Sequence, residues 1–179
     1  MSQDPRIRKV TFKKIFPNRL EIQIEERRAF LQIYQPEQKL YYLMDEEGVL
    51  LPDPQKEPQA DFLIFQDASL KAKPSRVGEK YPSQHLPKVI QNFETIQNDP
   101  LLEEENIREI QVDELGFWTF VTEDKIEFRV GNSFENLEKL ENFKLLLHSE
   151  VRQTLNYLDL RFQDVIVKIK SNLNNTKQK

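Results

Sequence analysis

Few side chains in this sequence combine into a recognisable reactive group. Two histidines occur, and His148 with Glu150 is the pair that comes nearest to the start of a metal site. No third ligand follows at a usual interval. His148 also stands where a helix is expected to end, and there the helix dipole favours an imidazole. His85 lies in a proline-rich stretch and forms no better site, so we expect no bound metal.

Carboxylates cluster at Asp45, Glu46 and Glu47, directly before Gly48. Two carboxylates can share acid and base roles only in a pocket that separates their pKa values, whereas a turn of this kind is expected to be solvated. The chain has four dispersed glycines and no cysteine, which excludes a glycine-rich phosphate loop and thiolate chemistry. We expect no catalytic residue, no cofactor and no enzymatic activity.

Aromatic residues at Phe117, Trp118 and Phe120 could in principle stack on nucleic-acid bases. Strand alternation instead places Trp118 and Phe120 together on one face, which favours core packing. The formal net charge is −4, and this balance argues against a general affinity for phosphate backbones. We expect no nucleic-acid partner.

The elements that must position these residues are mostly strands, because apolar residues alternate with polar ones over much of the chain. Val10 and Phe12, a turn at Phe16-Pro17-Asn18, and Leu20, Ile22 and Ile24 predict a hairpin with one buried face. Further strands are predicted at 40–44, 61–66, 107–112, 117–122, 126–130, 155–162 and 165–169.

Two segments have helical spacing instead. Apolar residues three and four apart predict a helix over 86–96, with Pro87 in its first turn. The stripe Phe134, Leu137, Leu140, Phe143 and Leu147 predicts a second helix. Asn132 or Ser133 can cap it, and Glu135 lies three residues past Asn132, as a capping box requires. Strands surrounding few helices make the fold class α+β.

Five stretches taken in order resemble the extracytoplasmic part of the bacterial cell-division proteins FtsQ/DivIB. They are IRKVTFKKIFPNRLEIQIEERRAFLQI, YYLMDEEGVLL, IREIQVDELGFWTFVTEDKIEFRVGN, FENLEKLENFKLLL and YLDLRFQDVIVKI. The pattern is an alternating strand ending in Glu-Arg, a strand closed by Asp-x-x-Gly, and an Asp-Leu-Arg strand near the C-terminus. The cluster Glu25-Glu26-Arg27-Arg28 is then a structural signature rather than a reactive site.

The resemblance implies a modular organisation. Residues 1–50 would be a partial POTRA module lacking its first strand and helices, residues 51–170 a mostly antiparallel FtsQ/DivIB-type β domain with about two helices, and residues 171–179 a disordered tail. In the full-length protein a membrane anchor is expected before this chain. The expected location is the extracytoplasmic face of the cytoplasmic membrane, at the division septum.

The family also implies a scaffold that holds small coiled-coil division proteins, FtsB/DivIC and FtsL, with no small-molecule substrate. An exposed strand edge in 155–169 would accept a partner strand through main-chain hydrogen bonds. The expected partner-binding residues are Arg161, Phe162, Asp164, Val165 and Val167. The alternative function is a POTRA-type envelope-assembly protein or another protein-binding module.

Overall fold

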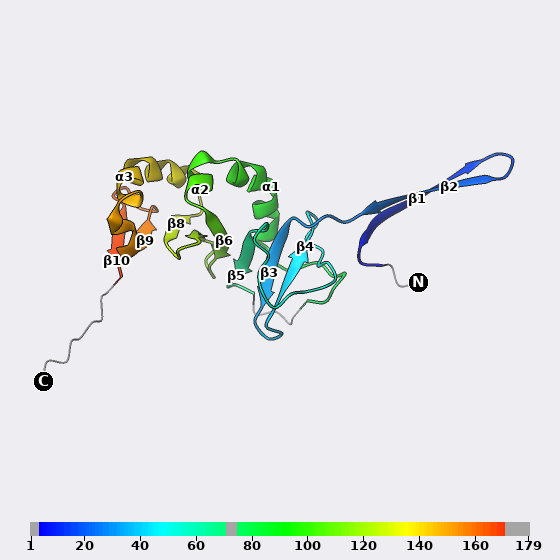
Figure 1. The fold of residues 1–179 in the computed structure, drawn as a ribbon, viewed down its shortest axis with the longest axis horizontal. Helices are drawn as coiled ribbons and strands as arrows, with labels where there is room; N and C mark the ends of the chain where they lie inside the picture. The colour runs from blue at the N-terminus through cyan, green and yellow to red at the C-terminus, as the bar shows by residue number, and fades with distance from the viewer. Residues whose placement is uncertain (1–3, 71–74, 171–179) are drawn as a thin grey trace, which may run out of the picture. The chain divides into compact units, whose positions relative to one another are not determined.

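The computed structural model describes residues 4–70 and 75–170, which form two compact units, Met1–Phe93 and Glu94–Lys179. Strands predominate in both units (Figure 1). The predicted α+β class, with a hairpin followed by a mostly antiparallel β domain, is confirmed. None of the helices in 4–70 and 75–170 has both the length and the apolar character that crossing a membrane requires.

The first element is the hairpin of β1 (Ile7–Ile15) and β2 (Arg19–Glu26), and its pairing is as predicted. Val10 lies opposite Ile24 and Phe12 opposite Ile22, so these side chains share one face. The prediction that this face is buried was wrong: Phe12 is 65% exposed and Ile22 53%. In the described chain β1 and β2 form a sheet of their own, and a sheet face is buried only by a second layer.

The rest of the first unit contains β3 (Leu31–Gln35), β4 (Leu40–Met44) and β5 (Ile64–Asp67), followed by α1 (Leu86–Gln97). β3 lies between the other two strands, antiparallel to β4 and parallel to β5. The start of α1 is stabilised by Ser83 Oγ, which accepts hydrogen bonds from the N–H groups of His85 and Leu86. Pro87 lies in the first turn, as predicted.

The turn after β4 corrects the expectation that its carboxylates are all solvated. Asp45 is only 2% exposed, because its side chain folds back to accept hydrogen bonds from the N–H groups of Glu47 and Val49. Arg27 forms an ion pair with both Asp45 and Glu47 and lowers the pKa of Glu47. Gly48 has a φ of +79°, and an added Cβ would lie 2.9 Å from Leu86, so the turn requires glycine.

The second unit begins with α2 (Pro100–Glu104) and then adds five strands in the order β6, β7, β8, β9, β10. They are β6 (Ile107–Val112), β7 (Trp118–Thr122), β8 (Glu127–Gly131), β9 (Leu155–Asp159) and β10 (Ile166–Ile169). All neighbours are antiparallel except β8 and β9. Trp118 and Phe120 are buried, as their alternation predicted.

The connection from β8 to β9 differs from the predicted α-helix. It consists of the 3₁₀ helix η1 (Phe134–Phe143), the short α3 (Lys144–Leu147) and the 3₁₀ helix η2 (Glu150–Thr154). A 3₁₀ helix has three residues per turn, so the three-residue spacing of Phe134, Leu137, Leu140 and Phe143 gives η1 one apolar face. Ser133 is the N-cap residue but makes no capping side-chain bond, so the expectation that its side chain caps the helix was wrong.

The proposed module boundary between residues 50 and 51 stays a prediction. It concerns where one family module gives way to the next, whereas the two compact units of the structure meet at Phe93 and Glu94. The predicted tail at 171–179 lies outside the described residues.

Candidate partner-binding edge

The last strand, β10, forms one edge of the sheet in the second unit. It pairs with β9 through Ile166 opposite Asp159, Val167 opposite Leu158 and Lys168 opposite Tyr157. Among the described residues no strand pairs with its other side. All four residues of β10 are exposed; the exposed fraction is 48% for Ile166 and 55% for Ile169. The edge is therefore both unpaired and apolar.

The main-chain groups of this edge can be assigned from the strand register. Leu160 donates its N–H to Arg129 O of β8, so by strand alternation Leu158 also directs its main chain toward β8, and Asp159 and Tyr157 direct theirs toward β10. Their partners Ile166 and Lys168 therefore bond to β9. Val167 is left with its N–H and C=O directed to the open side.

The opposite end of β10 gives the same assignment. Lys170 donates its N–H to Thr154 O, and every second residue of an extended strand points the same way. Lys168 thus faces β9, whereas Val167 and Ile169 face outward. Two independent hydrogen bonds, one on each strand, place the same main-chain groups on the free edge.

The segment that joins β9 to β10 is held by the Asp-Leu-Arg motif. Arg161 donates from Nε and Nη2 to the two carboxylate oxygens of Asp159, at 2.8 and 2.6 Å. This bidentate pair lowers the pKa of Asp159, which is 4% exposed. Gly131 allows Arg161 to pass, since an added Cβ there would lie 3.1 Å from Arg161 Cγ. The motif therefore fixes where the chain leaves the sheet.

The five residues that the sequence proposed for partner contact lie in one continuous stretch at this edge. Arg161, Phe162 and Asp164 are in the connection, Val165 enters β10, and Val167 lies within it. Phe162 is 51% exposed and Val167 37%. The Arg161 guanidinium lies 5.6 Å from the centroid of the Phe162 ring.

Sequence reasoning did not select Ile166 and Ile169, which are among the exposed apolar residues of the same edge. Both lie in the predicted strand 165–169, whose pattern is that of an ordinary half-buried strand. A single sequence does not indicate which strand lies at the edge of a sheet. Lys139 was missed as well. It contacts the β9–β10 connection from η1, twenty residues or more earlier in the chain, and no local pattern indicates such a contact.

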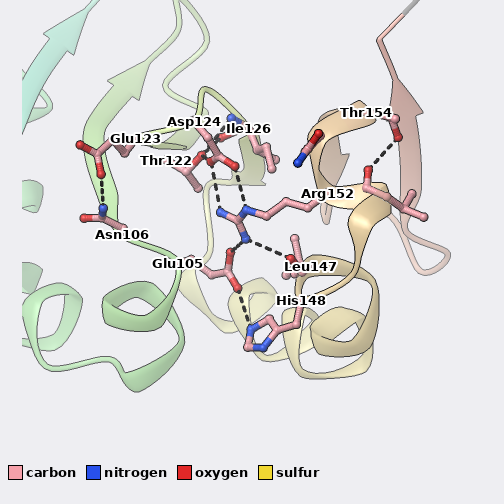
Figure 2. A network of polar contacts seen from close by, with 12 residues as sticks. Glu105, Asn106, Thr122, Glu123, Asp124, Ile126, Leu147, His148, Arg152 and Thr154 are labelled. Carbon is pink, nitrogen blue, oxygen red and sulfur yellow. Dashed lines mark hydrogen bonds and ion pairs between the residues drawn. The ribbon is translucent and has the colours of Figure 1, made fainter.

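A polar network centred on Arg152 positions η2, from which β9 starts (Figure 2). Arg152 Nη1 donates to Glu105 Oε2 at 2.5 Å, and its Nε donates to Asp124 Oδ2 at 2.7 Å. The hydrogen bond from Arg152 lowers the pKa of Asp124. Glu105 is 3% exposed, and His148 Nε2 lies 3.6 Å from its other oxygen. The charged groups of this cluster pair with one another. The cluster therefore has a structural role.

The remaining sequence candidates have structural settings too. His148 caps the C-terminus of α3, as predicted, and Asp45 is engaged by its own turn and by Arg27. Across residues 4–70 and 75–170 no group of three or more His, Asp or Glu side chains could hold a metal ion. Of the predicted site residues, those at the open edge of β10 combine outward main-chain groups with exposed apolar side chains.

Comparison with known proteins points to one family. The family model described as "Cell division protein FtsQ/DivIB, C-terminal" matches residues 33–161, well over half of the chain. Among solved structures, a similar chain is the major extracytoplasmic domain of the trans isomer of the cell-division protein DivIB from Geobacillus stearothermophilus. It is 15% identical, with 72% of this chain and 97% of that chain covered and a TM-score of 0.39. None of the curated proteins matches.

Proposed function

This chain belongs to the FtsQ/DivIB family of cell-division proteins, and we propose that it is a non-enzymatic scaffold that binds a small coiled-coil partner of the FtsB/DivIC type by strand addition to β10. FtsL is the second partner of this kind. The observation that carries the proposal is the unpaired β10 edge, where Val167 and Ile169 direct main-chain groups outward. In strand addition such groups supply affinity, and alternate side chains supply specificity.

The side chains at this edge suit a partner interface that is apolar at its centre and polar at its border. Phe162, Val167 and Ile169 present exposed apolar surface, and aromatic residues are frequent anchors of protein interfaces. Arg161 and Asp164 lie in the same connection and carry opposite charges. Exposed apolar residues on an unpaired edge also favour aggregation, so an edge of this composition is best explained by a partner that covers it.

The proposed location follows from the same family. The chain would act on the extracytoplasmic face of the cytoplasmic membrane at the division septum, held there by a membrane anchor in the full-length protein. Its contribution to septum formation would be to gather the partner proteins.

The test is calorimetric titration of the 179-residue chain with a peptide from the cognate FtsB/DivIC protein. We expect Phe162→Ala to weaken binding about tenfold or more, as for an aromatic anchor. Leu145→Ala is the matched control, because Leu145 is an apolar residue 90% exposed on α3 and outside the edge. Equal affinities of the wild-type and Phe162→Ala chains, or no binding by a folded wild-type chain, would refute the proposal.

A further inference from the structure

One ammonium group holds the segment that precedes β10. Lys139 Nζ, on η1, donates to Leu160 O at 2.7 Å and to Phe162 O at 2.8 Å. These carbonyls are two residues apart and converge on one donor, which fixes the main chain between them in a single arrangement. The Phe162 side chain departs from this fixed segment and is half exposed.

Among the described residues, the other main-chain hydrogen bonds hold the start of this segment. Leu160 donates its N–H to Arg129 O, and Arg161 donates its N–H to Asp159 Oδ1. Both bonds lie at or before Arg161, whereas Phe162 O is reached by Lys139. Arg161 of the Asp-Leu-Arg motif lies 5.6 Å from the Phe162 ring, whereas Lys139 holds the Phe162 main chain, so the position of Phe162 depends on Lys139 as well as on the motif.

We propose that Lys139 is a positioning residue for partner recognition, which holds Phe162 beside the open β10 edge before the partner arrives. This inference rests on the proposed function, since it names what prepares the same edge. A preorganised segment binds more tightly because its ordering does not have to be achieved during association. Lys139 itself need not touch the partner, as its ammonium is already engaged by the two carbonyls.

The neighbouring Lys144 provides a matched control. It also lies on the connection between β8 and β9, but its ammonium contacts the exposed carboxylates of Glu141 and Glu104. In the described chain it forms no hydrogen bond or ion pair with residues 160–165. Replacing either lysine by methionine removes one positive charge and keeps a similar aliphatic stem. An effect of net charge alone would therefore appear in both variants.

The test combines peptide binding with backbone ¹⁵N relaxation of residues 161–165 in the free chain. We expect Lys139→Met to weaken binding of the cognate FtsB/DivIC peptide about tenfold, the loss that corresponds to about 1.4 kcal/mol, and to increase the fast backbone motion of this segment. Lys139→Arg, which still offers several N–H donors, should restore much of both. Lys144→Met should change neither. Thermal unfolding confirms that each variant is folded.

The two readouts separate failure of this inference from failure of the proposed function. If the wild-type chain binds the peptide and Lys139→Met binds it equally well, the positioning role is overturned and the scaffold function stands. If the folded wild-type chain does not bind, the proposed function is overturned, and the positioning role in partner recognition falls with it. Unchanged backbone relaxation of residues 161–165 in Lys139→Met would overturn the inference whatever the binding result.

Discussion

Replacing Val167 by proline probes the free edge without disturbing the inner side of β10. Val167 directs its N–H away from β9, so proline at this position removes a donor that makes no bond within the sheet. Proline is tolerated on edge strands for this reason. We expect the free energy of unfolding to change by less than about 1 kcal/mol.

The effect on binding should be much larger. A partner strand added to β10 would present a carbonyl to the Val167 N–H, and a buried carbonyl left without a donor costs about 1–3 kcal/mol. The corresponding loss of affinity for the FtsB/DivIC peptide is roughly five- to 150-fold. Calorimetric titration measures it, with Val167→Ala as the control that shortens the side chain but keeps the N–H.

Lys168→Pro gives the reverse pattern, because the Lys168 N–H faces β9 and its loss breaks a bond within the sheet. It should lower the unfolding temperature, whereas Val167→Pro should not. A folded Val167→Pro chain that binds the peptide as tightly as Val167→Ala would contradict strand addition at this edge.

Two further predictions concern stability, measured by urea unfolding. Phe120→Ala should cost about 3–5 kcal/mol because Phe120 is fully buried, whereas Phe12→Ala on the exposed hairpin face should cost less than about 1 kcal/mol; equal losses would mean that this face is covered. Arg152→Met should cost about 3 kcal/mol at neutral pH because it leaves the Glu105 carboxylate buried beside fewer donors. Since Arg152 lowers the folded pKa of Asp124, that part of the stability is present above the unfolded pKa of about 3.9 and is lost as pH falls through the folded pKa. The difference between wild type and Arg152→Met should therefore shrink below about pH 4, and a difference that stays constant from pH 7 to pH 3 would contradict this origin.

Most strands were predictable from the sequence, and β3 was not. β6, β7 and β8 alternate as expected, with Trp118 and Phe120 inward. β3 was missed because its polar residue Gln32 is buried too, at 1% exposure. Its amide bonds to Gln59 O and Phe62 O, so a polar residue occupies an inner position and interrupts the apolar signal.

Alternation also cannot reveal whether a second layer is present. The β1–β2 hairpin has the pattern of a half-buried sheet, and its pairing was predicted correctly, but in the described residues its apolar face is exposed. The same limit applies to η1, where a repeat of three and four residues was taken as α-helical although the first four members repeat every three. In both cases the sequence showed the local pattern but did not show which tertiary contacts the element makes.

The candidate edge was predicted in part. The stretch that contains Phe162 and Val167 was proposed from its resemblance to a family, and the structure places Val167 on the outermost strand and Phe162 in the connection that leads into it. Which main-chain groups face outward depends on the pairing of β9 with β8 and of β10 with β9, which a sequence does not contain. Lys139 depends on a contact across more than twenty residues, for which the sequence offers no local signal.

Residue-resolved amide exchange at β10, with and without the FtsB/DivIC peptide, tests strand addition most directly. In the free chain the amides of Val167 and Ile169 should exchange rapidly, and that of Lys168 slowly, because only the last bonds to β9. Adding the peptide should slow exchange at Val167 and Ile169 and leave Lys168 nearly unchanged. Binding of the peptide with no new protection at Val167 and Ile169 would show that the partner does not add a strand to β10.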